Sequence, residues 1–93
     1  MITRNDYNIL KAITDKNDKN KGIIPSNGTT KREIIEITGL SNTKVSTSLK
    51  SFLDKGYIDN GLMVKNAKSY ILTKKGIMEY LKLKGVLNKE EGK

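Results

Sequence analysis

The chain has 93 residues, a length typical of one small domain. It contains no cysteine and no histidine, so disulfide frameworks and the usual zinc, haem and iron–sulfur sites are excluded, and we expect neither a metal nor a cofactor. Eighteen basic residues against ten acidic ones give a net charge of +8, which favours a polyanionic partner, either nucleic acid or an acidic membrane surface.

The N-terminal segment predicts a short helix, a polar loop and a short strand. Thr3 is placed to cap a helix in which apolar residues recur every three positions from Tyr7 to Ile13. Residues 15–21 are polar and charged, which is typical of a mobile loop. Residues 22–25 predict a very short strand. Pro25 marks its edge or its end, because proline cannot donate a ladder hydrogen bond.

Residues 30–58 predict two helices joined by a tight turn. Thr30 and Glu33 have the spacing of a capping box at the start of the first helix. Gly39 is suited to the left-handed residue that ends a helix, and Ser41 is placed to cap the second helix. This order indicates a helix-turn-helix, although an ordinary helical hairpin stays an alternative.

The second helix has one apolar face and ends at Gly56. The apolar residues, spaced i, i+4, i+7 and i+8, are Val45, Leu49, Phe52 and Leu53. After Gly56 the pattern changes to β-prone runs, and the best pairing is a hairpin of 62–65 against 69–72 with residues 65–68 at its tip. Whether residues 57–61 belong to the first strand or bend through a bulge is left open.

The C-terminal segment predicts a last helix over residues 74–84, with Thr73 as its cap and Gly85 as its natural end. Its apolar residues, expected to face the core or a partner chain, are Ile77, Met78, Tyr80 and Leu81. The predicted organisation is one domain over residues 1–87 and a flexible tail over residues 88–93.

Two motifs carry a resemblance to a known fold. They are GLSNTKVSTSLKSFLDKGYI, from Gly39 to Ile58, and YILTKKG, from Tyr70 to Gly76. With the order helix, short strand, helix, helix, hairpin, helix, they resemble winged helix-turn-helix domains of the α+β class, MarR-like regulators among them, over residues 5–84. The chain is also similar in size to centromere-binding adaptors of the TubR type. MarR-like regulators are longer, with an added dimerisation helix at each end, so the resemblance does not imply small-molecule sensing.

The resemblance implies that residues 42–55 form the recognition helix and that the wing tip touches the DNA backbone or the minor groove. The helix geometry points to the same surface, because at about 100° per residue the polar side chains lie opposite the apolar face. The predicted contacts of this helix are Asn42, Thr43, Lys44, Ser46, Thr47 and Lys50. A merely solvated face is the alternative, but Ser and Thr are mediocre helix formers and are an odd choice for it.

The most basic part of the chain is residues 65–84, which hold six lysines and one glutamate. Lys65 and Lys68 at the wing tip, and Lys74 at the start of the last helix, are predicted to contact phosphate. Lysines at positions 74 and 75 oppose the helix dipole, a conflict that a phosphate partner would relieve. Arg32 is a further predicted phosphate contact, with a solvated surface side chain as the alternative.

Catalysis is not expected, because the sequence has no histidine or cysteine for acid–base or nucleophilic work, its paired acidic residues at Asp15 and Asp18 lie in a polar loop, and it has no Gly-rich phosphate loop. No run of about 18 apolar residues and no signal-peptide pattern are present, and no predicted helix has the aromatic and basic faces of a membrane-surface helix. We therefore predict a cytoplasmic protein with no membrane partner.

The sequence predicts specific binding to double-stranded DNA by a bacterial, phage or plasmid transcriptional repressor. A homodimer is expected, because one short recognition helix reads only one half-site. Two alternatives stay open: a centromere-binding adaptor that binds repeated sites and recruits a cytoskeletal NTPase, and a winged helix that binds another protein.

Overall fold

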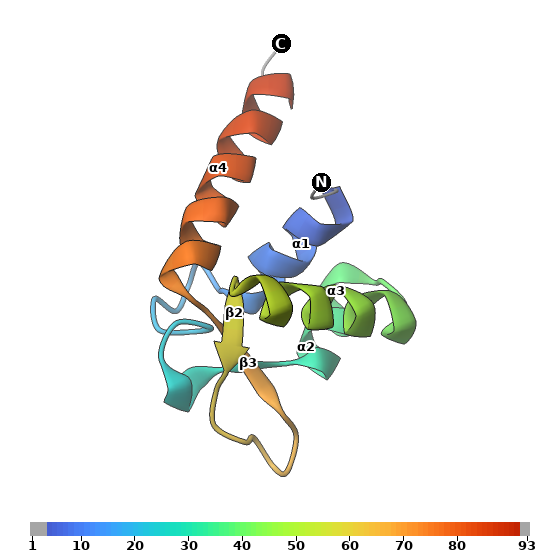
Figure 1. Ribbon diagram of the computed structural model, residues 1–93, viewed down its shortest axis with the longest axis vertical. Helices are drawn as coiled ribbons and strands as arrows, with labels where there is room; N and C mark the ends of the chain where they lie inside the picture. The colour runs from blue at the N-terminus through green and yellow to red at the C-terminus, as the bar shows by residue number, and fades with distance from the viewer. Residues whose placement is uncertain (1–3, 92–93) are drawn as a thin grey trace.

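The computed structural model describes residues 4–91. The α-helices are α1 (Arg4–Ile13), α2 (Lys31–Thr38), α3 (Asn42–Lys55) and α4 (Lys74–Glu91), and a 3-10 helix, η1 (Pro25–Asn27), precedes the first strand. The strands are β1 (Thr29–Thr30), β2 (Ile58–Asn60) and β3 (Ser69–Leu72). In Figure 1 the loop between β2 and β3 projects from one end of the molecule, and α4 extends from the other. The predicted α+β order of elements is confirmed.

The three strands form one antiparallel sheet in the order β1-β3-β2. Thr29 pairs with Tyr70 across β1 and β3, and Ile58 pairs with Leu72 across β2 and β3. The connection between β2 and β3, residues 61–68, is the wing. The wing begins at the edge strand β2 and ends at the central strand β3, so both of its ends continue from the sheet.

The first strand lies at residues 29–30, so the prediction of a strand at 22–25 was wrong. Thr29 is fully buried, and its hydroxyl donates to the Ile13 carbonyl oxygen at 2.5 Å, which holds this segment against the end of α1. Gly22 instead forms a turn with φ of 72°, and its N–H donates to the Asn27 carbonyl at 2.7 Å. The strand position was set by contacts with α1 and β3, which no local pattern reports.

The strand before the wing lies at residues 58–60 and not at 62–65, so that prediction was also wrong. Residues 58–60 form this strand themselves, and it begins after the two-residue turn that follows α3. Gly61 continues the pairing, since its N–H donates to the Ser69 carbonyl oxygen at 2.9 Å.

The loop after α1 has local order of its own. The Asn17 N–H donates to Asp15 Oδ1 at 2.8 Å, and the Asn20 N–H donates to Asp18 Oδ1 at 3.0 Å. Side chains that bond the backbone two residues on in this way form successive Asx turns. These turns, and not a regular strand, bring the chain back toward β1.

The core lies where α1, α2 and α3 meet the sheet. Its buried apolar side chains are Ile9, Leu10, Ala12, Ile13, Ile34, Val45, Leu49, Phe52, Ile58 and Leu72. Three residues of α3, Val45, Leu49 and Phe52, are at most 2% exposed, which confirms the predicted apolar face of that helix. The opposite face of α3 is thereby fixed toward solvent.

The predicted helix caps of the helix-turn-helix are confirmed. Thr30 and Glu33 form a reciprocal capping box at the start of α2, and Ser41 accepts a hydrogen bond from the Lys44 N–H at 3.1 Å at the start of α3. Gly39 ends α2 with a left-handed backbone, at φ of 71°. These local signals were sufficient because each depends on residues at most four positions apart.

The last helix begins where predicted, because Thr73 Oγ1 accepts a hydrogen bond from the Gly76 N–H at 3.0 Å. It does not end at Gly85, as predicted, but continues to Glu91. The residues after Gly85 include good helix formers, and they override a single glycine. The division between a domain over residues 1–87 and a tail stays a prediction, and the proposed cap at Thr3 lies outside the described residues.

Glu33 provides a pH-dependent contribution to stability. Burial opposes ionisation of its carboxyl, but hydrogen bonds from Lys21 Nζ and from Thr30 prevail and lower the pKa of Glu33 below its usual 4.5. The contribution of a carboxylate with a lowered pKa is present above the unfolded pKa and is lost as the pH falls through the folded pKa.

We expect Glu33→Gln to lower the free energy of unfolding by about 1 kcal/mol at pH 7, because the charged half of the capping box is lost. In urea unfolding at an acid pH below the lowered pKa of folded Glu33, where the wild-type carboxyl is also neutral, the difference should shrink toward zero. Glu36→Gln is the control, since Glu36 pairs with an Arg32 side chain that is 90% exposed. A difference for Glu33→Gln that is equally large at both pH values would contradict this account.

Candidate nucleic-acid interface

The exposed face of α3 carries a row of polar side chains. Asn42, Thr43, Thr47 and Lys50 are exposed, and the Ser46 side chain is half-buried beside them. The N-cap at Ser41 leaves the first turn of α3 at the surface, which is the part of a recognition helix that lies nearest the bases. The structure therefore brings together five of the six contacts predicted for this helix.

Lys44, the sixth, lies on the flank of α3 that faces α1. Its Nζ is 3.7 Å from Asp6 Oδ1, and the same carboxylate oxygen accepts a hydrogen bond from Ser48 Oγ at 3.0 Å. Asp6 thus fastens the first half of α3 to α1 and draws Lys44 toward it. Contact between Lys44 and DNA stays a prediction, with a backbone phosphate as the more accessible target from this flank.

Lys31, which the sequence analysis missed, connects the two helices of the helix-turn-helix. Its Nζ donates to Asn42 Oδ1 and to Ser46 Oγ, each at 3.2 Å. The Ser46 hydroxyl donates to the same Asn42 oxygen, so the NH2 group of Asn42 is the part available to an acceptor on DNA. A lysine at the first position of a helix opposes the dipole, and this signal was available in the sequence.

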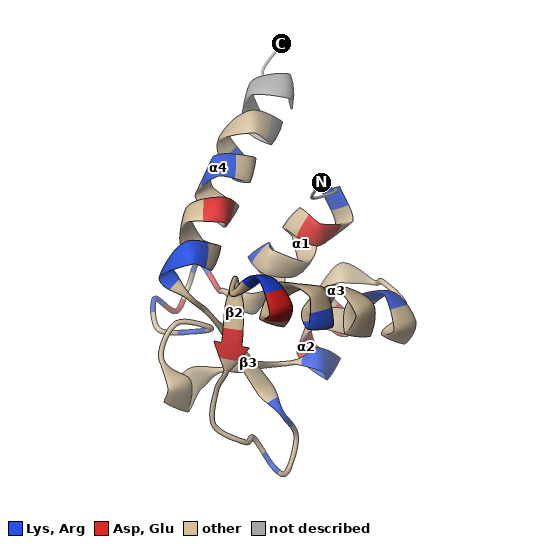
Figure 2. Ribbon diagram, viewed as in Figure 1, with Lys and Arg blue, Asp and Glu red and all other residues tan. Residues whose placement is uncertain are grey.

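A groove of about 320 Å³ separates the start of α2 from the wing. It is lined by Thr30, Lys31, Arg32, Ala67, Lys68 and Tyr70. Two predicted phosphate contacts, Arg32 and Lys68, therefore meet at one groove together with Lys31. The N-terminal amides of α2 add positive potential there, so the groove is suited to a phosphate group. Figure 2 shows basic residues on α2, on α3 and on the wing.

The tip of the wing is a two-residue turn. Val64 and Ala67 exchange two backbone hydrogen bonds of 2.9 Å, and between them Lys65 and Asn66 have φ of 48° and 67°. Two successive residues with positive φ form the type I′ turn, which fits the twist of a hairpin. The geometry places Lys65 at the extreme end of the wing, in agreement with the predicted tip.

The two lysines at the start of α4 have different surroundings. Lys74 is exposed and does not line the groove, so its contact with phosphate stays a prediction. Lys75 Nζ donates to the Lys55 carbonyl at the end of α3 at 2.8 Å and lies 5.2 Å from the centre of the Tyr57 ring. The conflict of Lys75 with the dipole of α4 is thus offset by the negative end of α3, without a phosphate.

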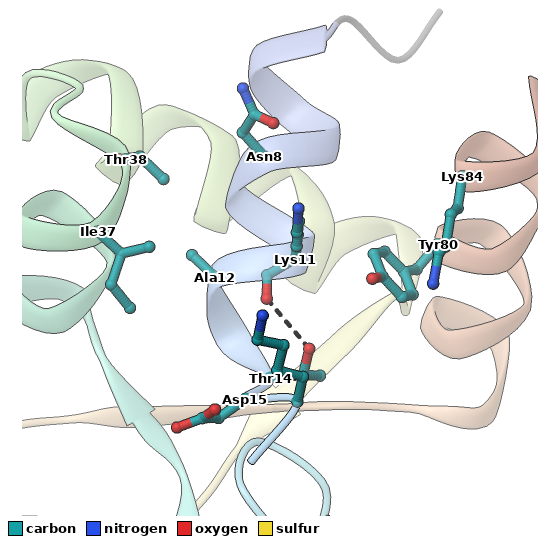
Figure 3. Close-up of a pocket in the computed structure, with 10 residues that line it drawn as sticks. Asn8, Lys11, Ala12, Thr14, Asp15, Ile37, Thr38, Tyr80 and Lys84 are labelled. Atoms are coloured by element: carbon teal, nitrogen blue, oxygen red, sulfur yellow. Dashed lines mark hydrogen bonds between the residues drawn. The ribbon is translucent and has the colours of Figure 1, made fainter. Parts of the chain in front are cut away.

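A separate hollow of about 760 Å³ lies beside α1 (Figure 3). Ile37 and Thr38 of α2 lie on one side of it, and Tyr80 and Lys84 of α4 lie on the other. The Tyr80 ring stacks on Tyr7 with centres 5.6 Å apart, and burial raises the pKa of Tyr7. None of the residues predicted to contact DNA lines this hollow. The hollow lies between α4 and the helices α1 and α2.

No protein-family profile and no curated protein matches this sequence. Among solved structures, MepR, a transcription regulator of the Staphylococcus aureus multidrug efflux pump MepA, matches 98% of this chain with a TM-score of 0.76 and 19% identity. This chain spans 62% of the length of that MepR chain. A structure of S. aureus MepR in complex with DNA is also similar, with a TM-score of 0.70 and 18% identity, over 97% of this chain and 68% of that one.

Two structures of TubR are similar as well. The DNA-binding TubR fragment from Clostridium botulinum matches 89% of this chain and 98% of its own with a TM-score of 0.65 and 24% identity. A type III plasmid segregation TubR matches 84% of this chain and 72% of its own with a TM-score of 0.62 and 29% identity. These similarities cover most of the chain, which consists of α1, the helix-turn-helix of α2 and α3, the hairpin with its wing and α4. This chain has the winged helix-turn-helix fold.

Proposed function

We propose that this protein binds specific sites on double-stranded DNA and acts as a transcriptional repressor in the cytoplasm. In this proposal α3 enters the major groove, and the wing contacts the adjacent backbone or minor groove. The solved structures with the same fold are DNA-binding regulators and segregation proteins and not enzymes. No helix among residues 4–91 is both long and apolar enough to cross a membrane.

The observation that carries the proposal is the junction of α2, α3 and the wing. Lys31, Arg32 and Lys68 line one groove, and Lys31 also holds the exposed Asn42 at the start of α3. A phosphate in that groove would lie beside the helix face that is free to reach base edges. The arrangement therefore combines backbone positioning and base reading on one side of the molecule.

We further propose that the protein acts as a homodimer. The sequence predicted that Met78 and Leu81 of α4 face the core or a partner chain, and their side chains are 64% and 56% exposed, so they do not face the core. A second copy packed on α4 would cover this apolar surface, and two copies would present two recognition helices to two half-sites.

A second candidate role is that of a centromere-binding adaptor in DNA segregation. The observation that favours it is the similarity to the plasmid segregation TubR, at 29% identity. Such an adaptor would use the same DNA-binding surface on repeated sites and would present another surface to a cytoskeletal NTPase. The two roles therefore differ in the arrangement of sites and not in the interface.

The test is fluorescence-anisotropy binding to DNA that flanks the gene for this protein, compared with scrambled DNA over a series of salt concentrations. Phosphate contacts by five cations, Lys31, Arg32, Lys50, Lys65 and Lys68, predict a slope of log K against log salt of roughly −4.5 for each bound chain. The proposal also predicts tight binding to the flanking DNA alone. Sedimentation on the selected DNA should show two chains for each site. Footprints at tandem repeats would favour segregation, and a single palindrome would favour repression.

Equal and weak binding to both DNAs would overturn the proposal. The positive charge would then have only its generic effect, and a protein-binding winged helix would be the better assignment. One chain for each selected site would remove the homodimer but would leave DNA binding intact.

A further inference from the structure

The wing carries three consecutive apolar side chains that the core does not cover. Leu62 is 61% exposed, Met63 is 60% exposed and Val64 is 38% exposed. Scattered single apolar residues are common on surfaces, but an uninterrupted run on a projecting loop is not. Polar residues would serve a solvated loop equally well, so the run indicates a partner surface that covers it.

This run is held in place by the backbone around it. The Leu62 N–H donates to the Pro25 carbonyl oxygen at 2.8 Å, and the Leu62 carbonyl accepts from the buried Ser69 hydroxyl at 2.6 Å. On the other side, Val64 is closed against Ala67 by the two hydrogen bonds of the tip. The apolar side chains therefore stand on a braced hairpin and do not fold back onto the core. A surface held in its exposed position loses little conformational entropy when a partner binds it.

The charges around the run identify the chemistry of the partner. Lys65 follows the run directly and Lys68 lies on the return limb of the hairpin, whereas residues 61–68 contain no acidic side chain and the nearest one is Asp59 in β2. Lys68 also lines the groove with Lys31 and Arg32, so the wing joins the apolar run to a cationic groove at its return limb. A partner surface that is complementary to these lysines and to the apolar run carries anionic groups on either side of an apolar area. The minor groove of DNA has this composition, because phosphates border sugar walls and stacked bases.

We propose that Leu62 and Met63 form an apolar wedge that enters the minor groove beside the wing lysines and bends the DNA. The proposal rests on the proposed function, since it requires that the protein bind double-stranded DNA. Apolar side chains inserted at a base step unstack it partly, and pyrimidine–purine steps yield most easily. The wedge would therefore add a preference for TA or CA steps under the wing, at positions that make no hydrogen bond to the protein.

The test compares the wild type with Met63→Ala and with the double variant Leu62→Ala/Met63→Ala on DNA that the wild type selects. The bend is measured by energy transfer between dyes at the DNA ends, and unstacking is measured by the fluorescence of 2-aminopurine placed at the step under the wing. Ile37→Ala is the matched control, because Ile37 is 64% exposed on α2 but lines the separate hollow beside α1.

We expect the wild type to bend the DNA and to raise the 2-aminopurine fluorescence. The double variant should bind about tenfold more weakly, lose most of the bend and leave the fluorescence unchanged, whereas Ile37→Ala should match the wild type. The slope of log K against log salt should be the same for all, because no charge is removed. The replaced side chains are exposed, so the variants should have the wild-type melting temperature.

Two results overturn the wedge while DNA binding stands. One is wild-type binding without a bend or a fluorescence change, and the other is an unaltered bend and affinity in the double variant. If the wild type selects no DNA in the anisotropy experiment, the proposed function fails first, and the wedge fails with it. A variant that binds DNA normally but loses a protein partner would assign the run to protein binding and would also overturn the wedge.

Discussion

Gly76→Ala should lower the melting temperature by about 15 °C, which corresponds to roughly 3 kcal/mol for a domain of this size. Gly76 is in the first turn of α4, where it packs against the backbone after α3. A Cβ atom built on Gly76 would overlap the carbonyl group of Tyr57. That carbonyl cannot withdraw easily, because it also accepts a hydrogen bond from the Thr73 N–H at 3.0 Å. Helix propensity alone would make the alanine variant more stable by about 1 kcal/mol. A lower melting temperature would therefore show that the close packing of Gly76 outweighs helix propensity.

The matched control is Gly85→Ala in the same helix. Apart from the backbone of the helix itself and the adjoining residues, nothing lies within 4 Å of a Cβ built on Gly85, so alanine should raise the free energy of unfolding by up to about 1 kcal/mol. Thermal unfolding followed by circular dichroism would compare the two variants. If Gly76→Ala is as stable as Gly85→Ala, α4 does not pack on the Tyr57 backbone as described. The expected result also gives a physical reason for the glycine that ends the YILTKKG motif.

Replacing Arg32 and Lys68 together by glutamate should weaken binding to the selected DNA by about 100-fold. Both side chains are exposed, and both line the groove between α2 and the wing. The loss of two charge-assisted hydrogen bonds to phosphate, at roughly 1.5 kcal/mol each, gives this factor. The slope of log K against log salt should become shallower by roughly two units, because two fewer counterions are released.

Lys16→Glu/Lys82→Glu is the control, because it changes the net charge equally at two exposed residues that do not line the groove. We expect it to reduce affinity by no more than a few-fold at about 0.15 M salt. At that ionic strength, screening limits the interaction between exposed charges to a range of about 8 Å. Anisotropy titrations of both double variants would measure the difference. An equal loss of affinity would show that net charge and not this groove determines binding.

The sequence alone was sufficient for the features that depend on neighbouring residues. The capping box at Thr30, the cap at Ser41 and the left-handed Gly39 are local, and together with the apolar face of α3 they predicted the helix-turn-helix. The order of elements followed from these signals and from the β-prone runs after Gly56.

The features that the sequence did not predict depend on residues far apart in the chain. The strand at residues 29–30 is fixed by a hydrogen bond to the end of α1, so its short sequence has no pattern of its own. The contacts that Lys31 and Lys75 make within the domain were not predicted, because their partners at Asn42 and at the Lys55 carbonyl are eleven and twenty positions away. The exposed run at Leu62 was read as a strand, since β-propensity cannot distinguish a paired strand from an apolar wing.

The central place of β3 in the sheet has a consequence for how the domain folds. Thr30 pairs with Ser69, so one loop of chain contains both helices of the helix-turn-helix and the whole wing. Closing a loop of that length costs chain entropy before the pairing is gained, and non-local pairing of this kind slows folding. This pairing therefore helps to set the angle between α3 and the wing. That angle is then lost by global unfolding and not by local fraying, so the two DNA-facing elements persist or disappear as one cooperative unit.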